Sequence, residues 1–295
     1  MNTIAQDQNS PPFLLLLKAR QRVYREATGF QIVQLIATVL LPLAGAALAT
    51  FVASSRPWVA LYGLIVTVID VFWIDRSQRD RSKTAAKISE KFDCGALRLP
   101  WNAFAVGKQI NAETIDAAAR KWSGDERKLL DWYSDIDGTA PLGLARVVCQ
   151  RTNLWYDSSL RRSYGKVLVC LVVIVVLMLV LVASLRDLPF LDLVAVAATV
   201  SPTVIWAARE RYRQLDAADS AEMIMAEAEK LLEQVRAGGC SDAECERRSR
   251  EFQDAIYARR VANPLILPLI YWKKRPEMEK RMKAGIESNL TGDSG

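Results

Sequence analysis

The stretch VLVCLVVIVVLMLVLVASL, residues 167–185, decides the class of this protein. It contains about 19 consecutive uncharged residues, and an α-helix of that length covers the ~30 Å hydrocarbon core of a bilayer. Lys166 precedes the stretch and Arg186 follows it, so its charges lie at its two ends. The stretch therefore predicts a transmembrane helix.

Three further apolar blocks accompany it, at 30–53, 58–74 and 188–208. Very short connections join the four blocks in pairs, which predicts two hairpins of two transmembrane helices each. Asp70 and Asp192 lie near block ends, where water and headgroups can reach a carboxylate, so we interpret them as interfacial acids. A buried core of a soluble helical protein is the alternative, and blocks of roughly 20 apolar residues argue against it.

Composition limits the functions that are possible. The 295 residues are 51% hydrophobic and 24% charged, and their mean hydropathy is +0.07, because the charges gather outside the apolar blocks. Histidine is absent, which removes the commonest general base and metal ligand. The chain also contains no P-loop, dinucleotide-binding or nucleophile-elbow motif. We therefore expect no enzyme activity, no metal and no cofactor.

The five cysteines are odd in number and widely spread. Their spacing predicts neither a disulfide framework nor a zinc site. Cys240 and Cys245 lie five residues apart with acids between them and are expected to be structural thiols.

Lysine and arginine set the expected orientation. They crowd the segments before, between and after the two hairpins, whereas the hairpin tips hold only Arg56 and Arg186. The positive-inside rule then places both termini and the middle segment in the cytosol. The expected fold is an all-α, multi-pass membrane protein with a helical cytosolic domain. Its parts are an N-terminal segment (1–29), hairpin 1 (30–74), a cytosolic helical segment (75–166), hairpin 2 (167–208), a second cytosolic helical segment (209–286) and a flexible tail (287–295).

The first and last apolar blocks carry small residues beside a proline, a pattern that permits close helix approach and a kink. These residues are Pro42, Gly45 and Ala49 in the first block and Ala195, Ala198 and Pro202 in the last. Two interpretations stay open. The two helices line or gate a pore in an oligomer, or they provide ordinary packing faces in a small bundle.

Helix signals recur in the cytosolic segments. Residues 76–93 predict a basic helix that continues from the membrane, and Pro141 suits the start of a helix running into 167–185. Ser123 and Ser241 each open a capping-box pattern, which predicts a helix beginning there. Alanine and leucine at spacings of four and three predict a packed helical seam over 217–235.

A proline-bracketed apolar stretch at 264–272 is too short to cross a membrane. We expect it to dock on the cytosolic domain or to lie at the membrane surface.

One segment combines groups that bind nucleotides. On a helix, Arg151, Trp155, Ser158 and Arg162 share one face. Arginine binds phosphate through two hydrogen bonds, and tryptophan stacks on a base. The alternatives are a plain packing face or a basic juxtamembrane helix that contacts anionic lipid.

Four short motifs point to a known family. They are Glu90-Lys-Phe-Asp-Cys94, Leu99-Pro-Trp-Asn102, Cys149-Gln-Arg-Thr-Asn153 and Tyr271-Trp-Lys-Lys-Arg275. In this order around four predicted spans, the chain resembles the SMODS-associating four-transmembrane effector family over roughly 18–283. The motifs add Trp101, Asn102 and Asn153 to the candidate ligand residues.

The resemblance implies a membrane effector of bacterial CBASS anti-phage systems. Its implied partners are a cyclic oligonucleotide second messenger bound on the cytosolic side, the lipid bilayer of the inner membrane and further copies of the same chain, without DNA. Binding would make the membrane part assemble or open and would damage the membrane. The alternative function is a non-enzymatic membrane scaffold or a constitutive small channel whose cytosolic helices bind a protein partner.

Overall fold

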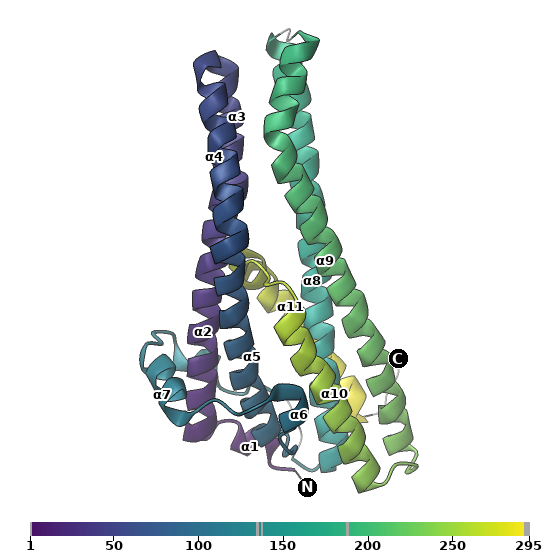
Figure 1. Cartoon of the computed structure of the whole chain (residues 1–295). Helices are drawn as coiled ribbons and strands as arrows, with labels where there is room; N and C mark the ends of the chain where they lie inside the picture. Colours follow the sequence, from purple (N-terminus) through teal and green to yellow (C-terminus); the bar gives the residue numbers. More distant parts are fainter. Residues whose placement is uncertain (1, 134–135, 137, 187–188, 292–295) are drawn as a thin grey trace.

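The computed structural model describes residues 2–133, 136, 138–186 and 189–291, and within these residues the regular structure is entirely helical. Two tall hairpins rise side by side from a helical base (Figure 1). Each hairpin extends beyond the apolar blocks that predicted it, and from here on the two names refer to the complete helical hairpins. Hairpin 1 consists of α2 (Pro11–Leu35), η1 (Ile36–Leu40), α3 (Leu41–Phe51), η2 (Ala53–Ser55), α4 (Arg56–Ile69), η3 (Asp70–Ile74) and α5 (Asp75–Ala96). Hairpin 2 consists of α8 (Leu142–Arg186) and α9 (Phe190–Arg236). The remaining elements are α1 (Ile4–Asp7), α6 (Ala103–Val106), α7 (Ala112–Arg120), η4 (Glu126–Lys128), α10 (Asp242–Ala262) and α11 (Pro268–Thr291).

The structure confirms an all-helical membrane protein. Two helices, Pro11–Leu48 and Leu142–Leu185, are long and apolar enough to cross a membrane. A third span results if the bent pair Phe190–Ala198 and Thr203–Arg236 counts as one. The fourth expected span contains the shorter apolar helix Pro57–Val66. Large apolar side chains are exposed along the hairpins, which suits a surface that faces lipid instead of water.

Both hairpins continue into the base without a break. The basic helix expected over 76–93 is α5, and the helix expected from Pro141 runs through the apolar block as α8 for 45 residues. The kink expected near Pro202 is present, since the two parts of α9 meet at 45° between Ala198 and Thr203. The helix α9 then carries the expected seam and ends before Gly238, whose φ of +70° favours glycine.

Each of the two helical arms of hairpin 1 contains one π-helical turn, η1 in the first arm and η3 in the second. Pro42 follows η1 by two residues, and its ring clashes with the carbonyl one turn earlier, which explains the wider turn. Asp70 begins η3 and accepts a hydrogen bond from Gln34 Nε2 at 2.8 Å. Asp70, the expected interfacial acid, is therefore hydrogen-bonded to the opposite helical arm of its own hairpin.

The main core lies in the base, where α2, α5, α8, α9 and α10 meet. Phe13 and Phe92 pack edge to face with ring centroids 5.8 Å apart. A Cβ at Gly95 would lie 2.5 Å from the Phe13 ring, so a side chain there would push the ring out of place. Glycine at 95 thus lets α2 and α5 approach.

The helix expected to begin at Ser123 is absent, and this prediction was wrong. Residues 126–128 form only the short turn η4, which Asp125 caps. Further along, Gln8 Oε1 accepts from the backbone N–H of Tyr133 at 2.7 Å, and Asn9 Oδ1 accepts from that of Asp131 at 2.9 Å. These side chains take the donors that a helix would use. By contrast, Ser241 caps α10 as expected, accepting from Glu244 N at 3.3 Å.

The fold also bears on two other expectations. Cys240 and Cys245 form a disulfide rather than separate thiols, because the turn after α9 returns the chain to the first turn of α10 and leaves their Cα atoms 6.2 Å apart. The stretch 264–272 docks on hairpin 2, where Ile270 packs with Leu160, Tyr164 and Ala207.

Candidate functional site

A small pocket of about 140 Å³ lies between α8 and α11. Its lining residues are Arg151, Thr152 and Trp155 from α8 and Arg281, Met282 and Gly285 from α11. The structure therefore brings two of the expected ligand residues, Arg151 and Trp155, into one cavity and adds a second arginine from a distant part of the chain. Guanidinium groups bind phosphate, and an indole stacks on a base.

The pocket's arginines already have carboxylate partners. Arg151 donates from Nε and Nη2 to one oxygen of Glu229 on α9, at 3.0 and 2.8 Å. Arg281, which is largely exposed, pairs with Glu277 at 2.8 Å. An anion that enters this pocket must compete with both carboxylates.

The other members of the expected face contact protein groups. Arg162 donates to Glu222 at 2.7 and 2.5 Å and to Asp219 at 2.6 Å, and its hydrogen bond to Glu222 raises the pKa of Arg162. Ser158 is buried, and its hydroxyl donates to the carbonyl of Trp155 at 3.1 Å. One end of the face thus lines the pocket, and the other packs against α9.

The remaining candidate residues lie outside the pocket. Trp101 Nε1 donates to the carbonyl of Gly107 at 2.9 Å, and Asn102 caps α6 while donating to Asp254 at 2.8 Å. Asn153 Nδ2 lies 3.4 Å from the hydroxyl oxygen of Tyr133. Each of these side chains holds a turn or a neighbouring element in place.

A buried polar cluster between α5 and α10 was not expected from the sequence. Glu90 and Asp93 are completely or almost completely buried. Arg250 pairs with Glu90 at 2.6 Å, Arg260 pairs with Asp93, and Gln253 donates to both carboxylates at 2.8 and 3.0 Å. The cluster ties hairpin 1 to α10. Two acids three residues apart on the apolar face of a helix were the signal that could have revealed it.

The electrostatics of this cluster favour its charged form. Burial alone would lower the pKa of Arg260, but the carboxylate of Asp93 outweighs burial and raises it. Burial also raises the pKa of Tyr133, whose hydroxyl donates to Asp93 at 2.6 Å, and that of Cys94 to about 12. The raised pKa values keep Arg260, Tyr133 and Cys94 protonated at neutral pH.

A second polar assembly lies where the two hairpins meet the base. We call residues 263–267, between α10 and α11, the clasp. The carbonyl oxygen of Leu265 accepts from Gln31 Nε2 of hairpin 1 and from Gln214 Nε2 of hairpin 2, both at 3.1 Å. Arg161 of α8 donates to the carbonyl of Pro264 at 3.0 Å and to Gln214 at 2.7 Å.

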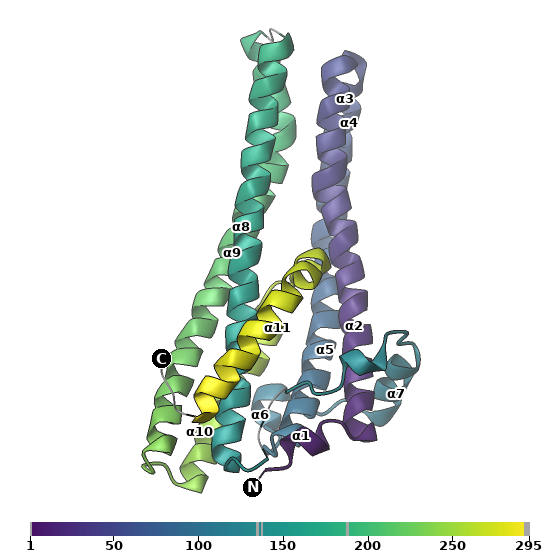
Figure 2. The same cartoon turned by 180° about the vertical axis from the view of Figure 1, so that it is seen from behind.

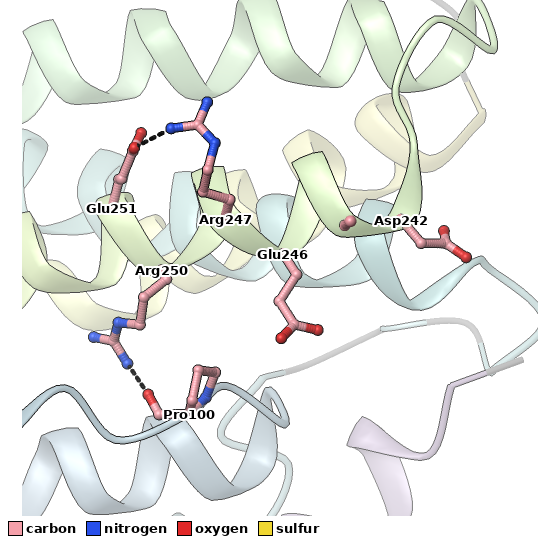
Figure 3. A pocket seen from close by; sticks show the side chains of 7 residues that line it. Pro100, Asp242, Glu246, Arg247, Arg250 and Glu251 are labelled. Carbon is pink, nitrogen blue, oxygen red and sulfur yellow. Dashed lines mark hydrogen bonds and ion pairs between the residues drawn. The ribbon is translucent and has the colours of Figure 1, made fainter.

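A larger cleft of about 530 Å³ lies beside the start of α10 (Figure 3). Its lining residues are Pro100, Asp242, Ala243, Glu246, Arg247, Arg250 and Glu251. Arg250 donates to the carbonyl of Pro100 at 2.8 Å, and Arg247 pairs with Glu251. Three carboxylates oppose two occupied guanidinium groups, so this cleft suits an anion less well than the α8–α11 pocket. Among the residues described, no three metal-ligating side chains are grouped to hold an ion.

Comparison with known proteins covers nearly the whole chain. The family model for the SMODS-associating 4TM effector domain matches residues 2–289. A probable CBASS effector molecule of Bacillus cereus (strain VD146) is 23% identical over 282 residues, which span 93% of this chain and 94% of that protein. No solved structure matches. The matched region includes both hairpins, the pocket and the clasp.

Proposed function

The chain belongs to the SMODS-associating 4TM effector family, and from this premise we propose that it binds a cyclic oligonucleotide in the cytosol and permeabilises the membrane in response. Family and relative together make it a membrane effector of CBASS anti-phage defence. The ligand, the membrane damage and the cytosolic position of both termini in the inner membrane are parts of the proposal.

One observation carries the proposal. Arg151 and Trp155, which line the pocket, lie on the same uninterrupted 45-residue helix as the apolar stretch 167–185. A change at the pocket therefore reaches the membrane through continuous backbone, with no loop to absorb it. The arginine and indole supply contacts for phosphate and base, and the helix supplies the connection.

The size of the pocket adds a condition. Sites for drug-sized ligands are commonly about 300–1,000 Å³. At about 140 Å³ the α8–α11 pocket holds one part of a nucleotide, such as a base. Accommodation of a cyclic oligonucleotide in this pocket thus requires α11 to move away from α8.

Permeabilisation through an oligomer accounts for the energy required. A shift from 1:99 to 99:1 between closed and open states needs about 5.5 kcal/mol of differential binding, and coupled copies can share that requirement. Ala198 is exposed on α9 and can contact another copy. Gly45 instead faces Val59 of its own hairpin, where an added Cβ would lie 2.9 Å from a methyl carbon. Pro42 follows η1, and the side chains of Ala49, Ala195 and Pro202 lie outside what the structure describes.

Dye release from liposomes tests the proposal. Vesicles containing the purified protein should stay tight until a member of a panel of cyclic di- and trinucleotides is added, and should then release the dye. Binding of the same panel to the protein in detergent is measured in parallel. Leakage without nucleotide would favour a constitutive channel, and binding without leakage would favour a scaffold.

A further inference from the structure

We propose that the clasp holds the two hairpins in their resting arrangement and that α11 releases it when the pocket fills. The release step rests on the proposed function, whereas the holding step stands on the contacts of the clasp itself. One carbonyl oxygen, that of Leu265, accepts hydrogen bonds from both hairpins. Both donors are buried, with Gln31 8% exposed and Gln214 0%.

Burial makes these two bonds matter. A buried amide that loses its partner bears the full cost of its lost hydration, so neither glutamine can leave the carbonyl without penalty. Pro264 within the clasp and Pro268 directly after it also restrict the backbone, because each proline ring fixes its φ angle. Motion that separates Gln31 from Gln214 must therefore break a hydrogen bond at Leu265.

The clasp is held more firmly on one side. On hairpin 2, Gln214 is itself fixed by Glu210 at 2.7 Å and by Arg161, which also bonds Pro264. On hairpin 1, Gln31 bonds the clasp through Nε2, while its Oε1 has no partner among the described residues. Release therefore occurs at Gln31, and the clasp stays with hairpin 2.

The helix α11 connects the clasp to the pocket. It begins at Pro268, directly after the clasp, and its other half supplies Arg281, Met282 and Gly285 to the pocket. In Figure 2, α11 runs diagonally from the side of α2 to the lower part of α8. Pro276 lies between these two ends, and the helix continues through it without a break. A ligand that pushes α11 away from α8 thus pulls on the segment that reaches Gln31.

The test removes the donor at Gln31. Methionine matches glutamine in length and cannot donate, so Gln31→Met breaks the bond, and Gln31→Glu places a carboxylate against the carbonyl. Gln109→Met changes an exposed glutamine far along the chain and serves as the matched control. The full-length variants are placed in liposomes without nucleotide, and hydrogen–deuterium exchange of residues 268–275 is followed in detergent.

Loss of one hydrogen bond of ordinary net strength shifts an equilibrium about fivefold. We expect Gln31→Met to raise both spontaneous dye release and exchange in 268–275 by about that factor, and Gln31→Glu to raise them further. Gln109→Met should match the wild type. If exchange and leakage are unchanged in both Gln31 variants, the clasp does not hold the hairpins and the inference fails. If exchange rises in the variants but no cyclic nucleotide of the panel changes it in the wild type, the holding step stands and the proposed function fails.

Discussion

Arg151 on α8 donates two hydrogen bonds to a single carboxylate oxygen of Glu229 on α9, at 3.0 and 2.8 Å. The guanidinium group is therefore neutralised within the wall of the pocket. Glu229 is 41% exposed and can turn to water at little cost, whereas Arg151 is 19% exposed and stays in place. This pair sets a threshold, because a ligand phosphate must bind Arg151 better than Glu229 does.

Removal of the competing carboxylate should lower that threshold. Partly exposed ion pairs contribute about 0.2–1 kcal/mol, so we expect Glu229→Gln to tighten nucleotide binding by a factor between about 1.4 and 5. Arg151→Ala should weaken binding by at least as much. Isothermal titration calorimetry in detergent measures both, and equal affinity in the wild type and Glu229→Gln would show that Arg151 does not bind the ligand.

Trp155 and Arg162 lie on one face of the helix expected from the sequence, but the structure predicts different effects on nucleotide binding when each is replaced. Trp155→Ala should weaken nucleotide binding by about 1–3 kcal/mol, the usual contribution of a stacked base. Arg162 is 43% exposed and paired with Glu222 and Asp219, so Arg162→Ala should keep the affinity and lose no more than about 1 kcal/mol of stability. A larger loss of affinity in Arg162→Ala than in Trp155→Ala would move the site toward α9.

The pocket can be filled from α11. An added Cβ at Gly285 would lie 3.8 Å from Nη1 of Arg151, so the first carbon fits and a longer side chain extends into the cavity. We expect Gly285→Leu to abolish nucleotide binding while the protein still inserts and folds. Gly29→Leu is the matched control, because an added Cβ there meets nothing within 4 Å. Normal binding in Gly285→Leu would place the ligand elsewhere.

Acid should weaken the ion-pair cluster that joins α8 to α10. Asp157 pairs with Arg161 and Arg259 at 2.9 and 2.8 Å. Burial would raise the pKa of Asp157, but the two guanidinium groups outweigh it and hold the pKa below its usual 3.8. Because the folded pKa is the lower one, this stabilisation is complete above pH 3.8 and is lost as the pH falls through the folded value. Thermal unfolding between pH 6 and pH 3 should show the loss in the wild type.

Asp157→Asn should remove this stabilisation at every pH. The substitution leaves two arginines, 8% and 9% exposed, without their shared carboxylate. Loss of one partner from a buried ion pair costs about 3–5 kcal/mol, and we expect the lower end because Asp157 is 33% exposed. The variant's melting temperature should then change little below pH 4, and a slope equal to that of the wild type would assign the acid sensitivity to another group.

Substitutions in the two small-residue helices should separate packing within a hairpin from assembly. In Gly45→Leu the new side chain would collide with Val59 of the same chain, so the substitution should destabilise hairpin 1 even in a protein that has not assembled. Ala198 is exposed, so Ala198→Leu should leave the fold intact and reduce nucleotide-dependent leakage by hindering contact between copies. Crosslinking in liposomes measures the assembly. Undiminished crosslinking and leakage in Ala198→Leu would exclude this face from the oligomer.

The membrane helices could be predicted because their signal is local. The uncharged run at 167–185 determines a span by its own length, and Pro141 marks where the helix begins. The absence of a helix after Ser123 could not be predicted. The backbone N–H groups of Asp131 and Tyr133 bond to Asn9 and Gln8, which lie more than a hundred residues away in the sequence.

The candidate site was predictable in its residue types but not in its contacts. Helical periodicity correctly put Arg151 and Trp155 on neighbouring turns. It contained no information on Glu229, 78 positions later, or on the wall that α11 adds. The clasp gave still less signal, because its central acceptor is a backbone carbonyl, which every residue possesses.

The uninterrupted course of α8 makes it a lever with three marked points. If α8 tilts about Arg161, which bonds the clasp, the arm to Arg151 at the pocket is roughly 15 Å and the arm to Arg186 at the tip is roughly 37 Å. Such a tilt displaces the tip of hairpin 2 about 2.5 times as far as it displaces the pocket end. A ligand that moves the short arm by only about 1 Å would swing the tip by more than the radius of a water molecule, roughly 1.4 Å.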